Sequence, residues 1–195
     1  MRPYRTPCCI AGALGLVLAA CAPSGFVYAP VRTTSAEVEG APAVVYDMPL
    51  HDAKGDVRVA MLGLAALQPV DVADNTLRAI HVVVEVHNRS GEVWSFDPAE
   101  ARAELTTRRE RSEVYATSAR IRPLPQVDVA PQSQAVIHLY FALPLHLQAE
   151  RLLPRFDVIW SIRMGEHAVT ERTAFQRFIA APPVDPDAGG SAHAP

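Results

Sequence analysis

The sequence predicts an all-β protein, an antiparallel sandwich of about seven to eight strands formed by residues 43–179. Apolar and polar residues alternate with a period of two in several segments, as in strands that bury one face. This pattern dominates over helical spacing throughout the region. Turn-forming residues separate the segments at intervals typical of an antiparallel sandwich.

Three strands are predicted in the first half of this region. Residues 43–48 form an edge strand, and residues 56–63 form the next, with Val57, Val59 and Met61 directed inward. The longest is residues 77–88, in which one face is aliphatic (Ile80, Val82, Val84 and Val86) and the other carries His81, Val83, Glu85 and His87. The turn-prone run at 88–91 ends this strand.

Residues 97–105 fit two local structures. Asp97 followed by Pro98 and Glu100 is typical of a helix start. Beyond Leu105, however, no apolar stripe continues, so a long helix would have nothing to pack against. We therefore expect one helical turn and then a short strand over residues 101–105.

The second half supplies the remaining strands. Residues 136–143 alternate, and residues 156–162 place Trp160 on the inward face. The proline-bounded run 143–154 between them fits a connecting turn or a short helix. A hairpin turn at 164–167 leads into a last strand over 168–178, in which neither register is clean because Glu171 shares a face with Phe175.

Composition excludes several classes of protein. The 195 residues include 18 basic and 21 acidic side chains, a formal net charge of −3. Nucleic-acid binding needs a basic excess, so no nucleic-acid partner is expected. Three cysteines without CxxC or Cys/His spacing predict neither a disulfide scaffold nor a zinc site.

The N-terminus has the pattern of an export signal. Arg2 and Arg5 precede a short apolar stretch that ends in Leu18-Ala19-Ala20-Cys21. This end resembles the lipobox of bacterial lipoproteins, in which the cysteine sulfur receives a diacylglyceryl group and cleavage follows. The pattern predicts a signal peptide over residues 1–20 and lipidation of Cys21; an ordinary signal peptide with an incidental cysteine is the alternative. In a Gram-negative host, Ala22 fits sorting to the outer membrane, facing the periplasm.

Two further segments are predicted to lie outside the sandwich. Residues 21–42 are rich in small, polar and proline residues and predict a flexible tether behind the lipidated cysteine. Residues 180–195 have almost nothing to bury and predict a disordered tail. Removal of residues 1–20 leaves 16 basic and 21 acidic residues, a net charge of −5.

Residues 77–178 resemble a group of bacterial lipoproteins that carry one immunoglobulin-like (telokin-like) sandwich. A valine-rich strand ending in Asn88-Arg89-Ser90, the segment 98–105, and the turn at 131–133 carry the resemblance. Gln132 stands where the group usually has glycine. The resemblance implies an immunoglobulin-like fold and an envelope location, and it transfers no catalytic residues.

One candidate site stands out on the strand 77–88. His81, Glu85 and His87 share a face and can bind zinc or copper, with His138 as a further ligand if its strand is a neighbour. A solvated outer face that happens to carry histidine is the simpler interpretation. Arg108, Arg109 and Arg111 with Glu104, Glu110 and Glu113 form a mixed-charge stretch, which fits a solvated loop or a partner or headgroup contact.

No pattern predicts catalysis. The sequence contains no Gly-x-Ser-x-Gly, and its serines occur in turn or strand contexts. We therefore expect a non-enzymatic protein without a cofactor other than its covalent lipid. It would act as an interaction or assembly module toward an envelope protein; the alternative is a periplasmic protein that binds a small ligand or a Cu/Zn ion.

Overall fold

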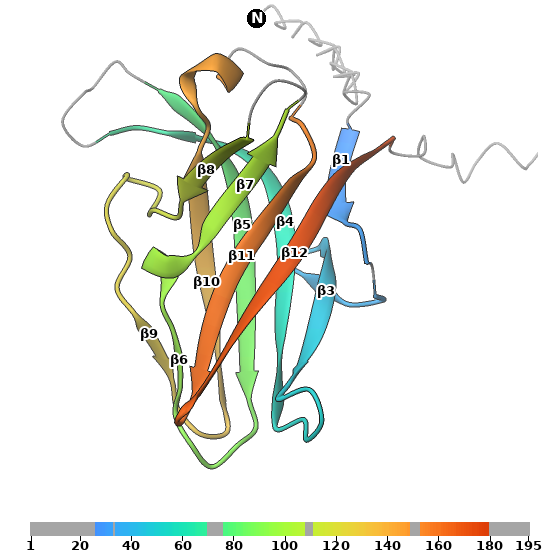
Figure 1. The fold of residues 1–195 in the computed structure, drawn as a ribbon, viewed down its shortest axis with the longest axis vertical. Coiled ribbons are helices and arrows are strands. Elements are labelled where there is room, and N and C mark those ends of the chain that lie inside the picture. Colours follow the sequence, from blue (N-terminus) through green and yellow to red (C-terminus); the bar gives the residue numbers. More distant parts are fainter. Residues whose placement is uncertain (1–25, 33, 70–75, 108–110, 149–152, 180–195) are drawn as a thin grey trace, which may run out of the picture.

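The computed structural model describes residues 26–32, 34–69, 76–107, 111–148 and 153–179. They form two antiparallel sheets packed as a β-sandwich (Figure 1). The seven-stranded sheet contains β1 (Phe26–Pro30), β6 (Trp94–Phe96), β7 (Arg102–Thr106), β8 (Arg111–Tyr115), β9 (Val127–Val129), β11 (Phe156–Met164) and β12 (His167–Ile179). The five-stranded sheet contains β2 (Glu37–Val38), β3 (Ala41–Met48), β4 (Gly55–Leu67), β5 (Leu77–Asn88) and β10 (Ser133–Ala142).

The strand order shows which strands are central and which are edges. The five-stranded sheet runs β10-β5-β4-β3-β2, with β5 and β4 at its centre. The other sheet runs β1-β12-β11-β6-β9, and β7 also pairs with β11 and carries β8 on its far side. The all-β, antiparallel prediction is therefore confirmed.

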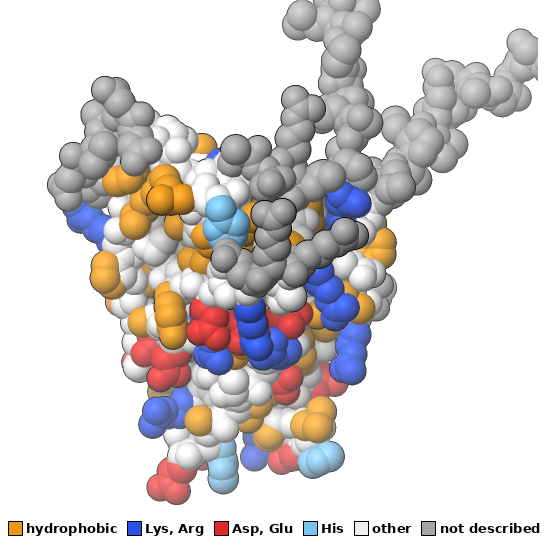
Figure 2. Space-filling view, turned by 45° about the horizontal axis from the view of Figure 1, so that its top comes forward, with side chains coloured by type: hydrophobic (Ala, Val, Ile, Leu, Met, Phe, Trp, Pro, Cys, Tyr) orange, Lys and Arg blue, Asp and Glu red, His pale blue; other side chains and the backbone are white. Residues whose placement is uncertain are grey.

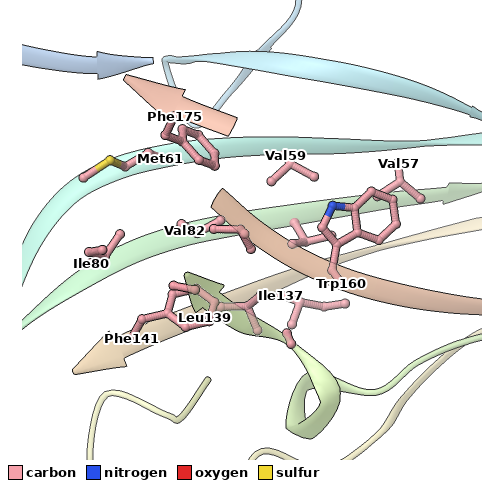
Figure 3. Packing of buried hydrophobic residues seen from close by; sticks show 14 of the residues in the cluster. Val57, Val59, Met61, Ile80, Val82, Ile137, Leu139, Phe141, Trp160 and Phe175 are labelled. Carbon is pink, nitrogen blue, oxygen red and sulfur yellow. The ribbon is translucent and has the colours of Figure 1, made fainter. Parts of the chain in front are cut away.

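The core lies between the inner faces of the two sheets. The predicted face of β5 is fully buried, and Trp160 on β11 is 0% exposed. Figure 3 shows Trp160 lying over the aliphatic side chains of β4 and β10. Thr173 on β12 accepts a hydrogen bond from Trp160 Nε1 at 3.1 Å and lies 2.9 Å from the hydroxyl of Tyr46 on β3. The contact between Tyr46 and Thr173 is partly buried and links the two sheets.

Several local predictions are confirmed. Asp97 caps a single 3-10 turn, η1 (Pro98–Glu100), by accepting a hydrogen bond from Ala99 N–H, and β7 follows directly. A second short turn, η2 (Leu145–Leu147), lies in the predicted connection before β11. Gly165, with φ of 59°, makes the hairpin turn between β11 and β12.

The strand number differs from the prediction, because the described residues form twelve strands. The additional ones are the short strands β1, β2, β6, β8 and β9, of two to five residues. A period of two cannot be recognised over so few residues. These strands are specified by the neighbours with which they pair.

Residues 26–30 differ most from expectation. The sequence predicts a tether there, but they form β1, which pairs with β12 from Phe26↔Ile179 to Pro30↔Phe175. Tyr28 explains why. Its ring packs against Phe156 at 6.4 Å between centroids, and its hydroxyl donates to the carbonyl of Leu153 at 3.1 Å.

The segment that contains β2 also departs from a free tether. Val38 packs on the outer face of the five-stranded sheet with Ala43, Ala60 and Val83, all at most 3% exposed. Val83 is therefore buried although it faces away from the main core. The predictions for residues 1–20, Cys21 and residues 180–195 lie outside the described residues.

Candidate functional site

The three proposed metal ligands on β5 lie on one face of its sheet, but His81 lies apart from Glu85 and His87. His81, Glu85 and His87 point outward because the alternate residues of β5 fill the core. The cross-strand partner of His81 is Tyr140, whereas that of His87 is Gln134. Six residues of extended strand separate the two histidines by about 20 Å. They therefore belong to two different clusters.

His87 lies in a charged cluster near the end of β5. Its Nδ1 is 3.4 Å from Asp56 Oδ1, and its Nε2 is 3.1 Å from Glu85 Oε1, a close approach without hydrogen-bond geometry. Asp56, with a side chain 4% exposed, also accepts hydrogen bonds from Arg58 Nε at 2.9 Å and Arg89 Nη1 at 2.7 Å. The carboxylate of Asp56 is thus hydrogen-bonded to two guanidinium groups and is not free to coordinate a metal. This arrangement is typical of an ion-pair network.

His81 instead contacts His138 on β10. Its Nε2 lies 3.0 Å from His138 Nδ1, and its ring stacks on Tyr140 at 4.2 Å between centroids. Glu39, in the turn between β2 and β3, places Oε1 3.6 Å from His138 Nε2. Burial lowers the pKa of His81 and the adjacent His138 lowers it further, while Glu39 acts in the opposite direction. His81 is therefore neutral near pH 7.

The contacts of His138 favour one tautomer. A carboxylate beside Nε2 favours a proton on that nitrogen, which leaves the Nδ1 lone pair directed at His81. The pair can then form a hydrogen bond or hold a metal through two imidazole nitrogens. Within the described residues, no group of three or more His, Cys, Asp or Glu side chains is placed to hold a metal ion.

The mixed-charge stretch contributes to a patch on the outer face of the seven-stranded sheet. Glu104, with a side chain 5% exposed, accepts a hydrogen bond from Arg172 Nη1 at 2.8 Å and another from Arg111 Nη2. Arg172 also donates to Asp157 at 2.8 Å. Figure 2 shows acidic and basic side chains gathered side by side on the visible face. Residues 108–110 of the stretch lie outside the described residues.

The turn after β5 is held by a buried amide. Asn88, 1% exposed, donates from Nδ2 to the carbonyls of Glu92, Val129 and Ala130 at 2.7 to 3.1 Å. Its Oδ1 accepts from the Ser90 backbone N–H and from the Ser90 hydroxyl. The Ser90 hydroxyl is therefore engaged in the turn and is not placed as a nucleophile beside a base.

A hollow of about 850 Å³ lies beside this turn, at the end of the sandwich where β11 meets β12. The buried rings and thioether of Trp94 and Met164 line it together with the charged or titratable side chains of Lys54, Arg89 and His167. Glu92 adds a negative charge to the same lining. The mixed lining selects no particular ligand class.

The outer edge of β10 is one edge of the five-stranded sheet. Thr117 exchanges two backbone hydrogen bonds with Tyr140, at 2.9 and 3.1 Å. Since backbone groups alternate in direction along an antiparallel strand, those of Gln134, Val136 and His138 point to the same side. In the part of the chain that the structure describes, no strand pairs with them there.

This edge also lacks the usual protection against pairing. Exposed edge strands commonly carry charged residues, prolines or bulges. Residues 133–142 contain no charged residue other than the titratable His138, and no proline. Val136 is 45% exposed on this strand. The edge is therefore competent to receive a further strand.

Together these features define an antiparallel β-sandwich with an open edge and a histidine pair. Among the described residues, no helix is long and apolar enough to cross a membrane. No family model and no curated protein matches the chain. One solved structure to which the chain is similar is the X-ray structure of Northeast Structural Genomics Consortium target SoR45. The two share 11% identity and a TM-score of 0.32, over 71% of this chain and 96% of that chain. Likeness at this level carries no argument about function.

Proposed function

We propose that this protein is a lipid-anchored envelope lipoprotein whose sandwich is a non-catalytic protein-interaction module of the immunoglobulin-like type. The lipobox-like run 18–21 supports the anchor. In a Gram-negative host, the module would face the periplasm from the outer membrane. The main observation in support of the interaction role is the open, uncharged edge of β10.

Strand addition at this edge depends mainly on backbone hydrogen bonds and so requires no specific side-chain sequence of the partner. An extended segment gains backbone hydrogen bonds from Gln134, Val136 and His138, and the exposed Val136 side chain supplies an apolar contact. No charged side chain of residues 133–137 has to lose its hydration. A protein segment with strand-forming residues is therefore the partner that this edge fits.

The interaction is tested by a photoreactive residue at position 134 of the full chain in its native membrane. We expect a reproducible cross-linked product with another protein chain, and Val136→Lys should reduce its yield at least fivefold. Val93→Lys is the matched control, because Val93 is 49% exposed outside the edge. The absence of any product, or a product unaffected by Val136→Lys, would contradict the edge as the interaction site.

The anchor has a separate test. Cys21→Ser removes the sulfur that would carry the diacylglyceryl group, so we expect the variant to leave the membrane fraction. Mass spectrometry of the wild-type N-terminal peptide should show lipid on Cys21. A variant that still requires detergent for extraction would refute lipidation as the anchor.

Metal binding is a second candidate, favoured by the geometry of His81 and His138. Two facing imidazole nitrogens, with Glu39 behind one of them, resemble the outer-sphere arrangement of histidine metal sites. Calorimetric titration with Cu(I) and Zn(II) should then show binding that His138→Ala abolishes and His87→Ala leaves intact. No heat above buffer would eliminate this candidate.

A further inference from the structure

The position of β1 sets the distance between the sandwich and the proposed anchor. Four residues, 22–25, separate Cys21 from the start of β1 at Phe26. A fully extended chain spans at most about 3.6 Å per residue, so Phe26 lies within about 18 Å of the Cys21 backbone. The end of the sandwich at which β1 begins is therefore held close to whatever holds Cys21.

The same end of the sandwich carries exposed apolar side chains. Figure 1 shows η2 and the last residues of β12 at the end where β1 begins. Leu145, the first residue of η2, is 86% exposed, and Phe178 near the end of β12 is 40% exposed.

We propose that this end of the sandwich is a membrane-contacting surface, and that Leu145 inserts into the phospholipid interface. The inference rests on the lipid anchor of the proposed function. With so short a link, a lipid surface is the one partner always within reach of this end. A leucine that leaves water for the boundary of headgroups and acyl chains gains the hydrophobic contribution.

The exposure of an apolar side chain does not by itself identify this end as the membrane-contacting surface. Leu50, in the turn between β3 and β4, is 77% exposed, and that turn lies at the opposite end of the sandwich (Figure 1). What distinguishes Leu145 is that η2 lies at the end of the sandwich where β1 begins (Figure 1). Leu50 therefore serves as a matched control for any measurement made at Leu145.

The test uses the full, lipidated chain in phosphatidylethanolamine–phosphatidylglycerol vesicles with brominated acyl chains. Leu145→Trp and Leu50→Trp each introduce one exposed indole, whereas Trp94 and Trp160 are 1% and 0% exposed and supply a constant background. We expect bromolipid to quench the new Leu145→Trp emission at least twofold more than that of Leu50→Trp, with a shift to shorter wavelength. Circular dichroism of both variants verifies the fold.

The outcomes separate this inference from the function on which it rests. Equal quenching of the two variants, in chains that carry lipid on Cys21, overturns the membrane-contacting surface and leaves the anchor in place. Absence of lipid on Cys21 in the wild-type chain overturns both. Stronger quenching at Leu145→Trp that persists after the other exposed apolar residue at this end is changed by Phe178→Ser supports insertion through Leu145 itself.

Discussion

The ionised form of Glu104 stabilises the folded state. Its carboxylate is nearly buried, and hydrogen bonds from Arg172 and then from Arg111 lower its pKa, while burial acts in the opposite direction. Because the pKa is lower in the folded state than in the unfolded chain, the stabilisation is complete above about pH 4.5. It is lost as the pH falls through the folded-state value.

Glu104→Gln is therefore expected to lower the free energy of unfolding at pH 7 by about 1–2 kcal/mol, a discounted value because Arg172 and Arg111 are half exposed. Urea denaturation at pH 7, 5 and 3 measures it. The difference from wild type should shrink as the pH falls below about 4.5, because protonation of the wild-type carboxyl removes the same ionic contacts. Glu113→Gln, an exposed carboxylate on the same sheet face, is the control and should cost less than 0.5 kcal/mol, roughly the range of surface substitutions. A difference that stays constant from pH 7 to pH 3 would contradict the ionic explanation.

At the candidate site, the sequence predicts on which face of a strand each side chain lies, but not which side chains of other strands it contacts. Alternation places His81 and His87 on the same side of β5, as observed. The contact between His81 and His138 depends on the register of β10 against β5, and that register is set by the packing of both inner faces. Glu39 reaches His138 only because residues 37–42 fold back as a hairpin. Neither contact has a local signal in the sequence.

The hairpin between β2 and β3 is the element on which this site depends. Glu39 and Gly40 form a two-residue connection with φ values of 50° and 77°, both in the left-handed region that a type I′ turn requires. No atom lies within 4 Å of a Cβ built on Gly40, so a side chain there would cause no clash. Its only cost would come from the left-handed backbone conformation.

Gly40→Ala should therefore destabilise the protein by about 1 kcal/mol. Gly91→Ala is the control, since its added Cβ also meets open space and its φ lies outside the left-handed region. It should be neutral or slightly stabilising. Thermal unfolding of both variants distinguishes them, and equal midpoints would show that the turn is not strained by alanine.

Strand length decides which elements the sequence predicts. β4 and β5 span thirteen and twelve residues, enough for alternation to be recognised. β1 has five residues that end in proline, a composition typical of a tether. Its partner is β12, and the contact of Tyr28 with Phe156 that fixes it joins residues 128 positions apart. Such long-range pairing overrides local propensity.

At the scale of the whole molecule, β1 changes the relation between the sandwich and the proposed anchor. The sequence alone predicts a tether of residues 21–42, long enough for the domain to rotate freely above a membrane. With β1 in the seven-stranded sheet, only residues 22–25 remain as the link. The open edge of β10 and the hollow lined by Trp94 would then be presented at fixed sides relative to the membrane.

Lengthening this link should uncouple orientation from attachment. Insertion of ten Gly/Ser residues after Ser24 adds a flexible segment with a mean span of about 17 Å, which lowers the effective concentration of Leu145 at the lipid surface. We expect the bromolipid quenching of Leu145→Trp to fall toward that of Leu50→Trp, while membrane attachment through Cys21 is unchanged. An insertion of the same residues in the exposed turn at Asp52 is the control, because it leaves the link intact. Undiminished quenching in the lengthened chain would show that insertion of Leu145 holds this end at the membrane without help from the short link.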